Sequence, residues 1–262
     1  MKIAISGKGG VGKTLLASLL AHKFAESGYS VLAIDADPDA NLATSLGFPH
    51  PETIIPISEM KELIAERTGS SPGKGEVYFR LNPKVDDLPE KYWQKMDSIK
   101  LMVMGQVKRG GGGCYCPENV LLRALVNHLL LARNEVVIMD MAAGIEHLGR
   151  ATASAVDKLI VVVEPGRRSL ETARIIKKLA EDIGLRNIAV VGNKIRNPSD
   201  REFVISSLPG FEFISFIPFD QAIIEADQAS VPLVHASKPV TDEVANIYQR
   251  LVRATQHQNV IR

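Results

Sequence analysis

Cysteine is scarce in this sequence, with two among 262 residues, Cys114 and Cys116, separated by a single residue. A pair so close does not form the disulfide framework of a small secreted protein. Long apolar runs are also missing, since none reaches the ~18 residues of a membrane span. Met1 leads directly into an apolar strand and leaves no room for a signal peptide. We therefore expect a cytoplasmic protein without a membrane partner.

The sequence also has no excess of charge of either sign. It carries 31 basic and 30 acidic residues, for a net charge of +1. This balance indicates neither a nucleic-acid-binding protein nor an acidic tail, so we expect no nucleic-acid partner. No internal repeat is present, and low-complexity sequence is limited to the glycine run at 110–113.

Apolar strands alternate with amphipathic helices along most of the chain. This alternation predicts an α/β fold, a doubly wound and mostly parallel sheet with helices on both faces. A chain of 262 residues can bury one large core, and we expect a single domain over 1–262. The exception is an irregular insertion at about 48–100, with one short helix at 58–67, opened by Ser58 as its N-cap. Six of the 14 prolines fall there and limit regular structure: Pro49, Pro51, Pro56, Pro72, Pro83 and Pro89.

The most informative motif is G-K-G-G-V-G-K-T at residues 7–14, which fits the phosphate-binding pattern G-x-x-x-x-G-K-[S/T]. It follows an apolar strand at 2–6 and precedes an amphipathic helix at 14–26, the context that the pattern requires. Glycines let several N–H groups point at one anion, and the helix start adds its positive end. We expect Lys13 to reach the terminal phosphates and Thr14 to hold Mg²⁺. The residues expected to line the phosphates are Gly9, Gly10, Val11, Gly12, Lys13 and Thr14.

Lys8 distinguishes this loop from an ordinary P-loop, which needs no cation after its first glycine. The loop resembles the deviant Walker A loop of the MinD/ParA/nitrogenase-iron-protein class of ATPases. This resemblance implies a P-loop NTPase fold of the MinD-like type and a homodimer that encloses ATP. It also implies that Lys8 crosses the dimer interface to the partner's phosphates and acts in catalysis together with Lys13.

Acidic residues follow two buried strands near the loop. Asp35 and Asp37 end the strand at 29–34, and Asp140 ends the strand at 135–139. Ligands of open parallel sheets bind at such strand ends, and carboxylates there hold Mg²⁺ or orient water. By resemblance to the class, Asp37 orients the attacking water and Asp35 supports the Mg²⁺ site. Asp140 would bind Mg²⁺ largely through water, and the N–H of Gly144 would sense the γ-phosphate.

The base is expected beside the later strands. Asn193 follows the strand at 187–192 and is placed to read a base edge. GTP-binding proteins of this kind carry N-K-x-D, whereas Arg196 stands in the fourth position here, so adenine and hence ATP or ADP are favoured. By resemblance to the class, Pro218 packs beside the base.

Cys114 and Cys116 form a second motif, preceded by four glycines and followed by Pro117, which suits the first turn of a helix. A helix start lowers thiol pKa values, and two thiolates make half of a tetrahedral sulfur site. A two-fold dimer would supply the other half. We expect one metal ion, shared across the dimer.

G-G-C-x-C-P-E-N at 112–119, together with the loop and D-M-A-A-G at 140–144, resembles the CooC/AcsF family. The resemblance implies an ATP-driven dimer that binds Ni²⁺ or Zn²⁺ through this pair. The client would be carbon monoxide dehydrogenase or acetyl-CoA synthase, and the sequence leaves client and metal open. The alternatives are a positioning ATPase like MinD or ParA, which would not need the cysteines, and a redox ATPase like the nitrogenase iron protein. The latter also needs two cysteines, but places them far apart.

Overall fold

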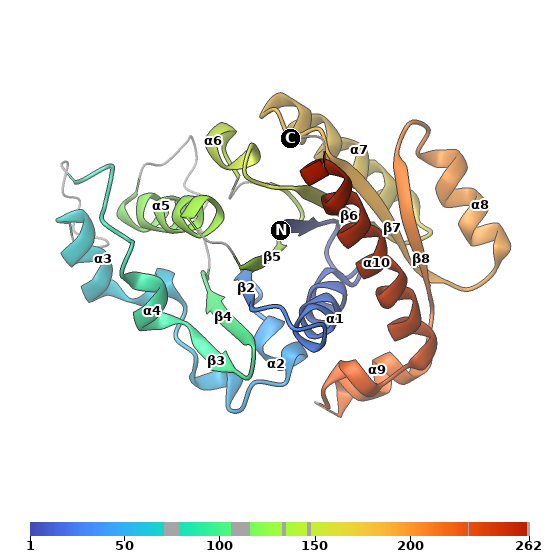
Figure 1. Ribbon diagram of the computed structural model, residues 1–262, viewed down its shortest axis with the longest axis horizontal. Coiled ribbons are helices and arrows are strands. Elements are labelled where there is room, and N and C mark those ends of the chain that lie inside the picture. The colour runs from blue at the N-terminus through green and yellow to red at the C-terminus, as the bar shows by residue number, and fades with distance from the viewer. Residues whose placement is uncertain (71–78, 106–115, 133–134, 146–147, 230, 261–262) are drawn as a thin grey trace.

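The computed structural model describes residues 1–70, 79–105, 116–132, 135–145, 148–229 and 231–260. These residues form one eight-stranded sheet in the order β3-β4-β2-β5-β1-β6-β7-β8 (Figure 1). All pairings are parallel except β3 with β4. The expected α/β fold is confirmed. The strands are β1 Lys2–Ser6, β2 Val31–Ala36, β3 Gln94–Met96, β4 Ile99–Val103, β5 Val136–Met141, β6 Lys158–Val163, β7 Ile188–Ile195 and β8 Glu212–Pro218.

Helices cover both faces of the sheet (Figure 1). They are α1 Lys13–Glu26, α2 Leu42–Leu46, α3 Lys61–Thr68, α4 Leu88–Tyr92, α5 Pro117–Ala132, α6 Arg150–Ala153, α7 Arg167–Asp182, α8 Pro198–Ser207, α9 Gln221–Gln228 and α10 Lys238–Val260. Because side chains alternate across a strand, the central strands feed two buried clusters, one on each face. One cluster contains α1, α2 and α10, and the other contains α5 and α7.

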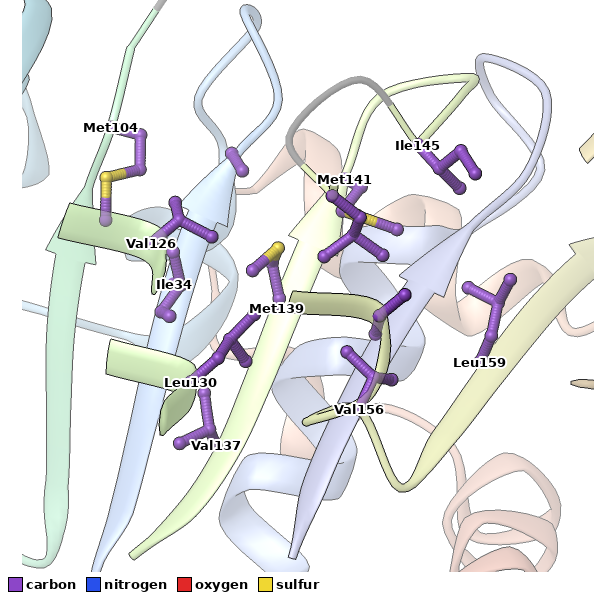
Figure 2. Packing of buried hydrophobic residues seen from close by; sticks show 14 of the residues in the cluster. Ile34, Met104, Val126, Leu130, Val137, Met139, Met141, Ile145, Val156 and Leu159 are labelled. Carbon is purple, nitrogen blue, oxygen red and sulfur yellow. The ribbon is translucent and has the colours of Figure 1, made fainter. Parts of the chain in front are cut away.

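Figure 2 shows the second of these clusters from close by. Val137, Met139 and Met141 are alternate residues of β5, and their side chains lie on the same face of the sheet. Val126 and Leu130 of α5 pack on that face, and all five side chains are buried. The helix therefore covers this face of β5, whereas Asp140, between Met139 and Met141, has its side chain on the opposite face.

The order of strands creates a crevice at the end of β1. From β1 the chain moves to β2 on one side, and after β5 it crosses to β6 on the other side. Ligands of doubly wound sheets bind at such a reversal, outside the carboxyl ends of the strands. The glycine-rich loop that joins β1 to α1 lies at this point.

The insertion predicted at about 48–100 consists of short elements, including two 3₁₀ turns, η1 Pro51–Thr53 and η2 Ile57–Glu59. Its helix α3 begins at Lys61 instead of Ser58, because the Ser58 N–H donates to the Met104 carbonyl beside β4. Buried side chains of the insertion belong to the same cluster as β2 and α5: Ile57, Leu63, Ile64, Val85 and Leu88. These side chains of the insertion are therefore part of the core beneath the sheet.

The apolar stripe of the last helix is part of the core. Val240, Val244, Ile247 and Leu251 are each at most 4% exposed and pack with α1 and β8. Among the described residues, the structure contains no helix with the length and apolar character needed to span a bilayer.

Candidate nucleotide site

The loop between β1 and α1 has a backbone that only glycine tolerates at two positions. Gly7 has φ +153°, and a Cβ on it would lie 2.3 Å from the Val162 carbonyl oxygen of β6. Gly12 has φ +95°, and a Cβ there would lie 2.2 Å from the Asn193 amide nitrogen. The loop therefore packs closely against β6 and β7, and it places the N-terminus of α1 in the crevice.

Lys13 and Thr14 begin α1 and face the acidic residues of the neighbouring strands. Lys13 is 5% exposed, and its Nζ lies 3.5 Å from Oδ2 of Asp37. The Thr14 hydroxyl donates to Oδ2 of Asp140 at 2.6 Å. The other carboxylate oxygen of Asp140, Oδ1, is buried without a hydrogen-bond partner in the described part of the chain. A hydroxyl and an orphaned carboxylate oxygen at one point fit the oxygen ligands that Mg²⁺ prefers.

Asp35 and Asp140 are direct neighbours on β2 and β5, and both are fully buried. Burial raises the pKa of Asp35 to about 6, although N–H groups of Leu42 and Asp37 donate to its two oxygens. Burial raises the pKa of Asp140 to about 7, and the Thr14 hydroxyl opposes this shift. Because burial disfavours the ionised forms of both carboxyl groups, a cation bound beside them would stabilise these forms.

The turn after β5 is held to β1. The Ser6 hydroxyl lies 2.8 Å from the Gly144 carbonyl oxygen and 3.1 Å from that of Ala142. The Gly144 N–H donates to the Ala142 carbonyl at 2.7 Å. The amide expected to sense the γ-phosphate is therefore engaged within its own turn, so it has to exchange this bond before it can meet a phosphate.

Two residues at the end of β7 hydrogen-bond to the phosphate loop. Asn193 is 3% exposed and donates its amide to the Val11 carbonyl at 2.7 Å. The adjacent Lys194 has φ +58° and donates its Nζ to the Gly10 carbonyl at 2.6 Å. In this structure the Asn193 amide holds the loop, and its role in reading a base edge stays a prediction.

Sequence reasoning did not single out Lys194 or Glu164. Glu164 follows β6 and places one carboxylate oxygen 3.2 Å from Lys194 Nζ and the other 4.0 Å from Lys8 Nζ. The Lys8 side chain is 38% exposed, so it stays accessible at the rim. The sequence does contain a signal for these two residues, because polar residues follow the apolar stretches that form β6 and β7, at the edge where the loop lies.

A cavity of about 700 Å³ opens at the phosphate loop. Pro218 and Phe219 also line it, and the Arg196 guanidinium lies 4.4 Å from the centre of the Phe219 ring. Asp220 begins α9 by accepting the Ala222 N–H, and it also accepts the Ser237 hydroxyl. The cavity therefore has a phosphate end at the loop and a partly apolar end suited to a base. Its loop and strand-end residues are Gly9, Gly10, Gly12, Lys13, Thr14, Asp37, Asn193 and Lys194.

The cysteine motif is only partly described. Cys116 is half-buried and immediately precedes Pro117, the first residue of α5, as expected. Cys114 lies outside the described residues. Within the part of the chain that the structure describes, no three His, Cys, Asp or Glu side chains gather as a metal site.

Residues 2–233 match the family described as the CobQ/CobB/MinD/ParA nucleotide-binding domain. The chain belongs to the CobQ/CobB/MinD/ParA family. The carbon monoxide dehydrogenase accessory protein CooC of Rhodospirillum rubrum is 47% identical over 245 residues, which cover 93% of each chain. An uncharacterised ATP-binding protein of Methanocaldococcus jannaschii is 45% identical over 97% of this chain and 98% of its own. The expected resemblance to CooC-type members of the CobQ/CobB/MinD/ParA family is confirmed.

Solved structures agree with this membership at the level of the fold. A chain of the MinC:MinD cell division complex of Aquifex aeolicus superposes with a TM-score of 0.68 at 24% identity. The match covers 96% of this chain and 95% of that one. The architecture is thus the one shared across the CobQ/CobB/MinD/ParA family.

Proposed function

We propose that this chain is an ATP-hydrolysing maturation factor that carries nickel to carbon monoxide dehydrogenase or acetyl-CoA synthase. The similarity to CooC over 93% of both chains carries the proposal. Family membership and the ATP-binding relative support the ATPase activity. The described site supports it further, since it has a phosphate end, a base end and a buried acidic pair.

The ATP phosphates would lie in the loop, contacted by backbone N–H groups from Gly9 to Gly12 and by Lys13. Thr14 and Asp140 would hold Mg²⁺, with the orphaned Oδ1 of Asp140 directed toward the metal or its water. Bound Mg²⁺ supplies positive charge that neutralises the phosphates during transfer. The hydrogen bond from the Thr14 hydroxyl to Asp140 holds these two groups together.

Asp37 is the group proposed to orient the attacking water. Its carboxylate is 20% exposed and lies 3.5 Å from Lys13 Nζ, so it already faces the phosphate end of the cavity. The Asp39 N–H donates to its other oxygen, Oδ1, at 3.1 Å, which limits the rotation of the carboxylate. A fixed acceptor beside the γ-phosphate position is what water orientation needs.

Lys8 is proposed to act across a dimer. Its contact with Glu164 is at 4.0 Å and part-exposed, so it is weak, and a partner's phosphate would compete for the lysine. ATP binding would then join two copies through their phosphate loops, with each Lys8 contacting the nucleotide of the other copy.

Nickel is the cargo in this proposal, and Cys114 and Cys116 are its ligands. Thiolates bind Zn²⁺ as well as Ni²⁺, so either ion would occupy the pair. Two chains would supply four sulfur ligands around one ion. ATP closes the same interface, so the nucleotide state would alter the geometry around the metal and favour its release.

Metal titration of anaerobically purified protein tests the cargo site. We expect one ion per dimer, and loss of both binding and metal-driven dimerisation in Cys116→Ala, with nucleotide binding retained. His128→Ala removes another metal-capable side chain near the pair in sequence and serves as the control. One ion per monomer, or unchanged binding in Cys116→Ala, would refute the shared site.

Light scattering with ATP tests the ATPase cycle. Asp37→Asn should bind ATP, hydrolyse it at least ~100-fold more slowly and accumulate as a dimer. Lys8→Ala should bind ATP without forming that dimer. A Lys8→Ala protein that dimerises and hydrolyses ATP normally would remove the role of this lysine across the interface.

A positioning ATPase that binds a membrane would need an amphipathic anchor. The apolar stripe of α10 is taken up in the core, so it offers no such anchor. This stripe therefore does not support the membrane-binding form of the positioning alternative.

A further inference from the structure

A groove borders the outer edge of β8. β8 is the last strand of the sheet in the described part of the chain, so no further strand pairs with its outer side. Figure 1 shows β8 between α10 and α8. A groove of about 580 Å³ runs over the strand between these two helices. This volume lies within the roughly 300–1,000 Å³ typical of ligand pockets.

The strand contributes four consecutive residues to the groove, Phe213, Ile214, Ser215 and Phe216. Ile214 and Ser215 are buried, whereas the two phenylalanines are half-buried. Because no described strand pairs with the outer side of β8, the backbone groups that point outward are not bonded within the sheet. Backbone N–H and C=O groups on such an edge are a template for another strand.

Arginines surround this edge. Arg201 comes from α8, whereas Arg250 and Arg253 come from α10, and all three line the groove. Its single carboxylate, Glu243, already accepts the Ser215 hydroxyl at 2.5 Å. Among the residues that line the groove, arginines therefore outnumber carboxylates. This edge is a local concentration of positive charge.

The chemistry of the groove favours an extended peptide over a nucleic acid. Guanidinium groups pair bidentately with carboxylates, and a free strand edge accepts a peptide backbone. Single-stranded nucleic acids need open aromatic faces for their bases. Phe213 and Phe216 stack on each other at 5.5 Å, and Arg201 lies over Phe216 at 4.7 Å from the ring centre. The ring faces are thus occupied.

We propose that the outer edge of β8 binds an extended acidic segment of a partner protein, which joins the sheet as an additional strand. Side chains of such a segment would alternate between the two helices. Arg250 of α10 and Arg201 of α8 border the edge from its two sides. The segment would therefore carry one acidic residue that faces Arg250 and an adjacent one that faces Arg201. The nucleotide cycle proposed above is not required for this binding.

The test uses two synthetic peptides, one with two adjacent aspartates flanked by threonines and one with lysines in the same two positions, with fluorescence anisotropy as the readout. The acidic peptide should bind, more weakly as salt rises, and the lysine peptide should not. Arg250→Glu and Arg201→Glu should each weaken binding by roughly tenfold, because repulsion replaces attraction. Arg123→Glu makes the same charge change on α5 and should bind like the unchanged protein.

A second measurement tests strand addition itself. Hydrogen exchange of the β8 backbone should slow when the acidic peptide is added, and an acidic peptide N-methylated along one edge should lose binding. Equal binding of the N-methylated peptide would overturn strand addition. Equal binding of a thymidine oligonucleotide with the same arginine dependence would overturn the choice of a peptide. If the arginine variants bind the peptide normally but self-associate, the arginines only protect the edge and the proposal is wrong.

Discussion

Asp140→Asn should stabilise the protein without nucleotide and Mg²⁺, even though it removes a residue of the proposed site. Asp140 is fully buried, and its pKa rises from 3.8 to about 7, mainly through burial. Each pKa unit corresponds to ~1.4 kcal/mol, so keeping this carboxylate ionised costs about 4 kcal/mol above pH 7. Asparagine removes the charge, and its carbonyl still accepts the Thr14 hydroxyl.

The sign of the pH dependence follows from proton binding. Between pH 4 and 7 the folded protein holds a proton on Asp140 that the unfolded chain has lost, so its stability falls as pH rises through this range. Above the folded pKa the full penalty is present. Between pH 5 and 8 this one group should lower the free energy of unfolding by about 3 kcal/mol. Asp35, with a pKa of about 6, adds a similar trend that the variant retains.

Urea denaturation at pH 5 and pH 8, without nucleotide or Mg²⁺, measures this effect. The free energy of unfolding of the variant should exceed that of the unchanged protein most at pH 8, and it should depend less on pH. The variant should also lose Mg²⁺-dependent ATP hydrolysis. Asp182→Asn changes an exposed carboxylate of α7 and is the control. If Asp140→Asn keeps the slope of the unchanged protein, or is less stable at pH 8, burial does not control this carboxyl group.

Three further predictions concern the loop and the core. Gly12→Ala should weaken ATP binding at least ~10-fold in calorimetry, because its Cβ would lie 2.2 Å from the Asn193 amide, and unchanged affinity would contradict the close approach. Lys194→Met removes the bond to Gly10 and should weaken ATP binding several-fold while leaving the fold intact by circular dichroism; an equal affinity would show that the loop holds its shape without this bond. Phe24→Ala should cost ~3–5 kcal/mol in urea denaturation, because this ring is fully buried, and a loss under ~1 kcal/mol would mean that the site refills.

The nucleotide site could be anticipated because its signals are local. The loop pattern at 7–14 fixes the positions of Lys13 and Thr14 relative to α1, and the acidic residues end apolar strands. Parallel strands bring their carboxyl ends to one edge, so Thr14 and Asp140 meet although 126 residues separate them.

The hydrogen bonds from the end of β7 to the phosphate loop could not be predicted from a local pattern. The bond from Lys194 to Gly10 depends on β7 lying two strands from β1, and on a positive φ at a lysine. Neither property is encoded in a short pattern, because strand order and strain arise from the packing of the whole sheet. The start of α3 differed for a related reason, since Ser58 contacts a residue 46 positions away. The metal role of the cysteine pair stays a prediction.

The two ends of the sheet are unlike, and this difference bears on polymerisation. A filament built by adding sheet to sheet would pair β3 of one copy with β8 of the next, a head-to-tail contact that never closes. β3 has three residues, runs antiparallel to its neighbour and exposes Lys95, whereas β8 has seven residues and is bordered by arginines. Such a junction would be short and would oppose like charges. The architecture therefore permits many copies to share a crowded compartment without fusing their sheets into fibres.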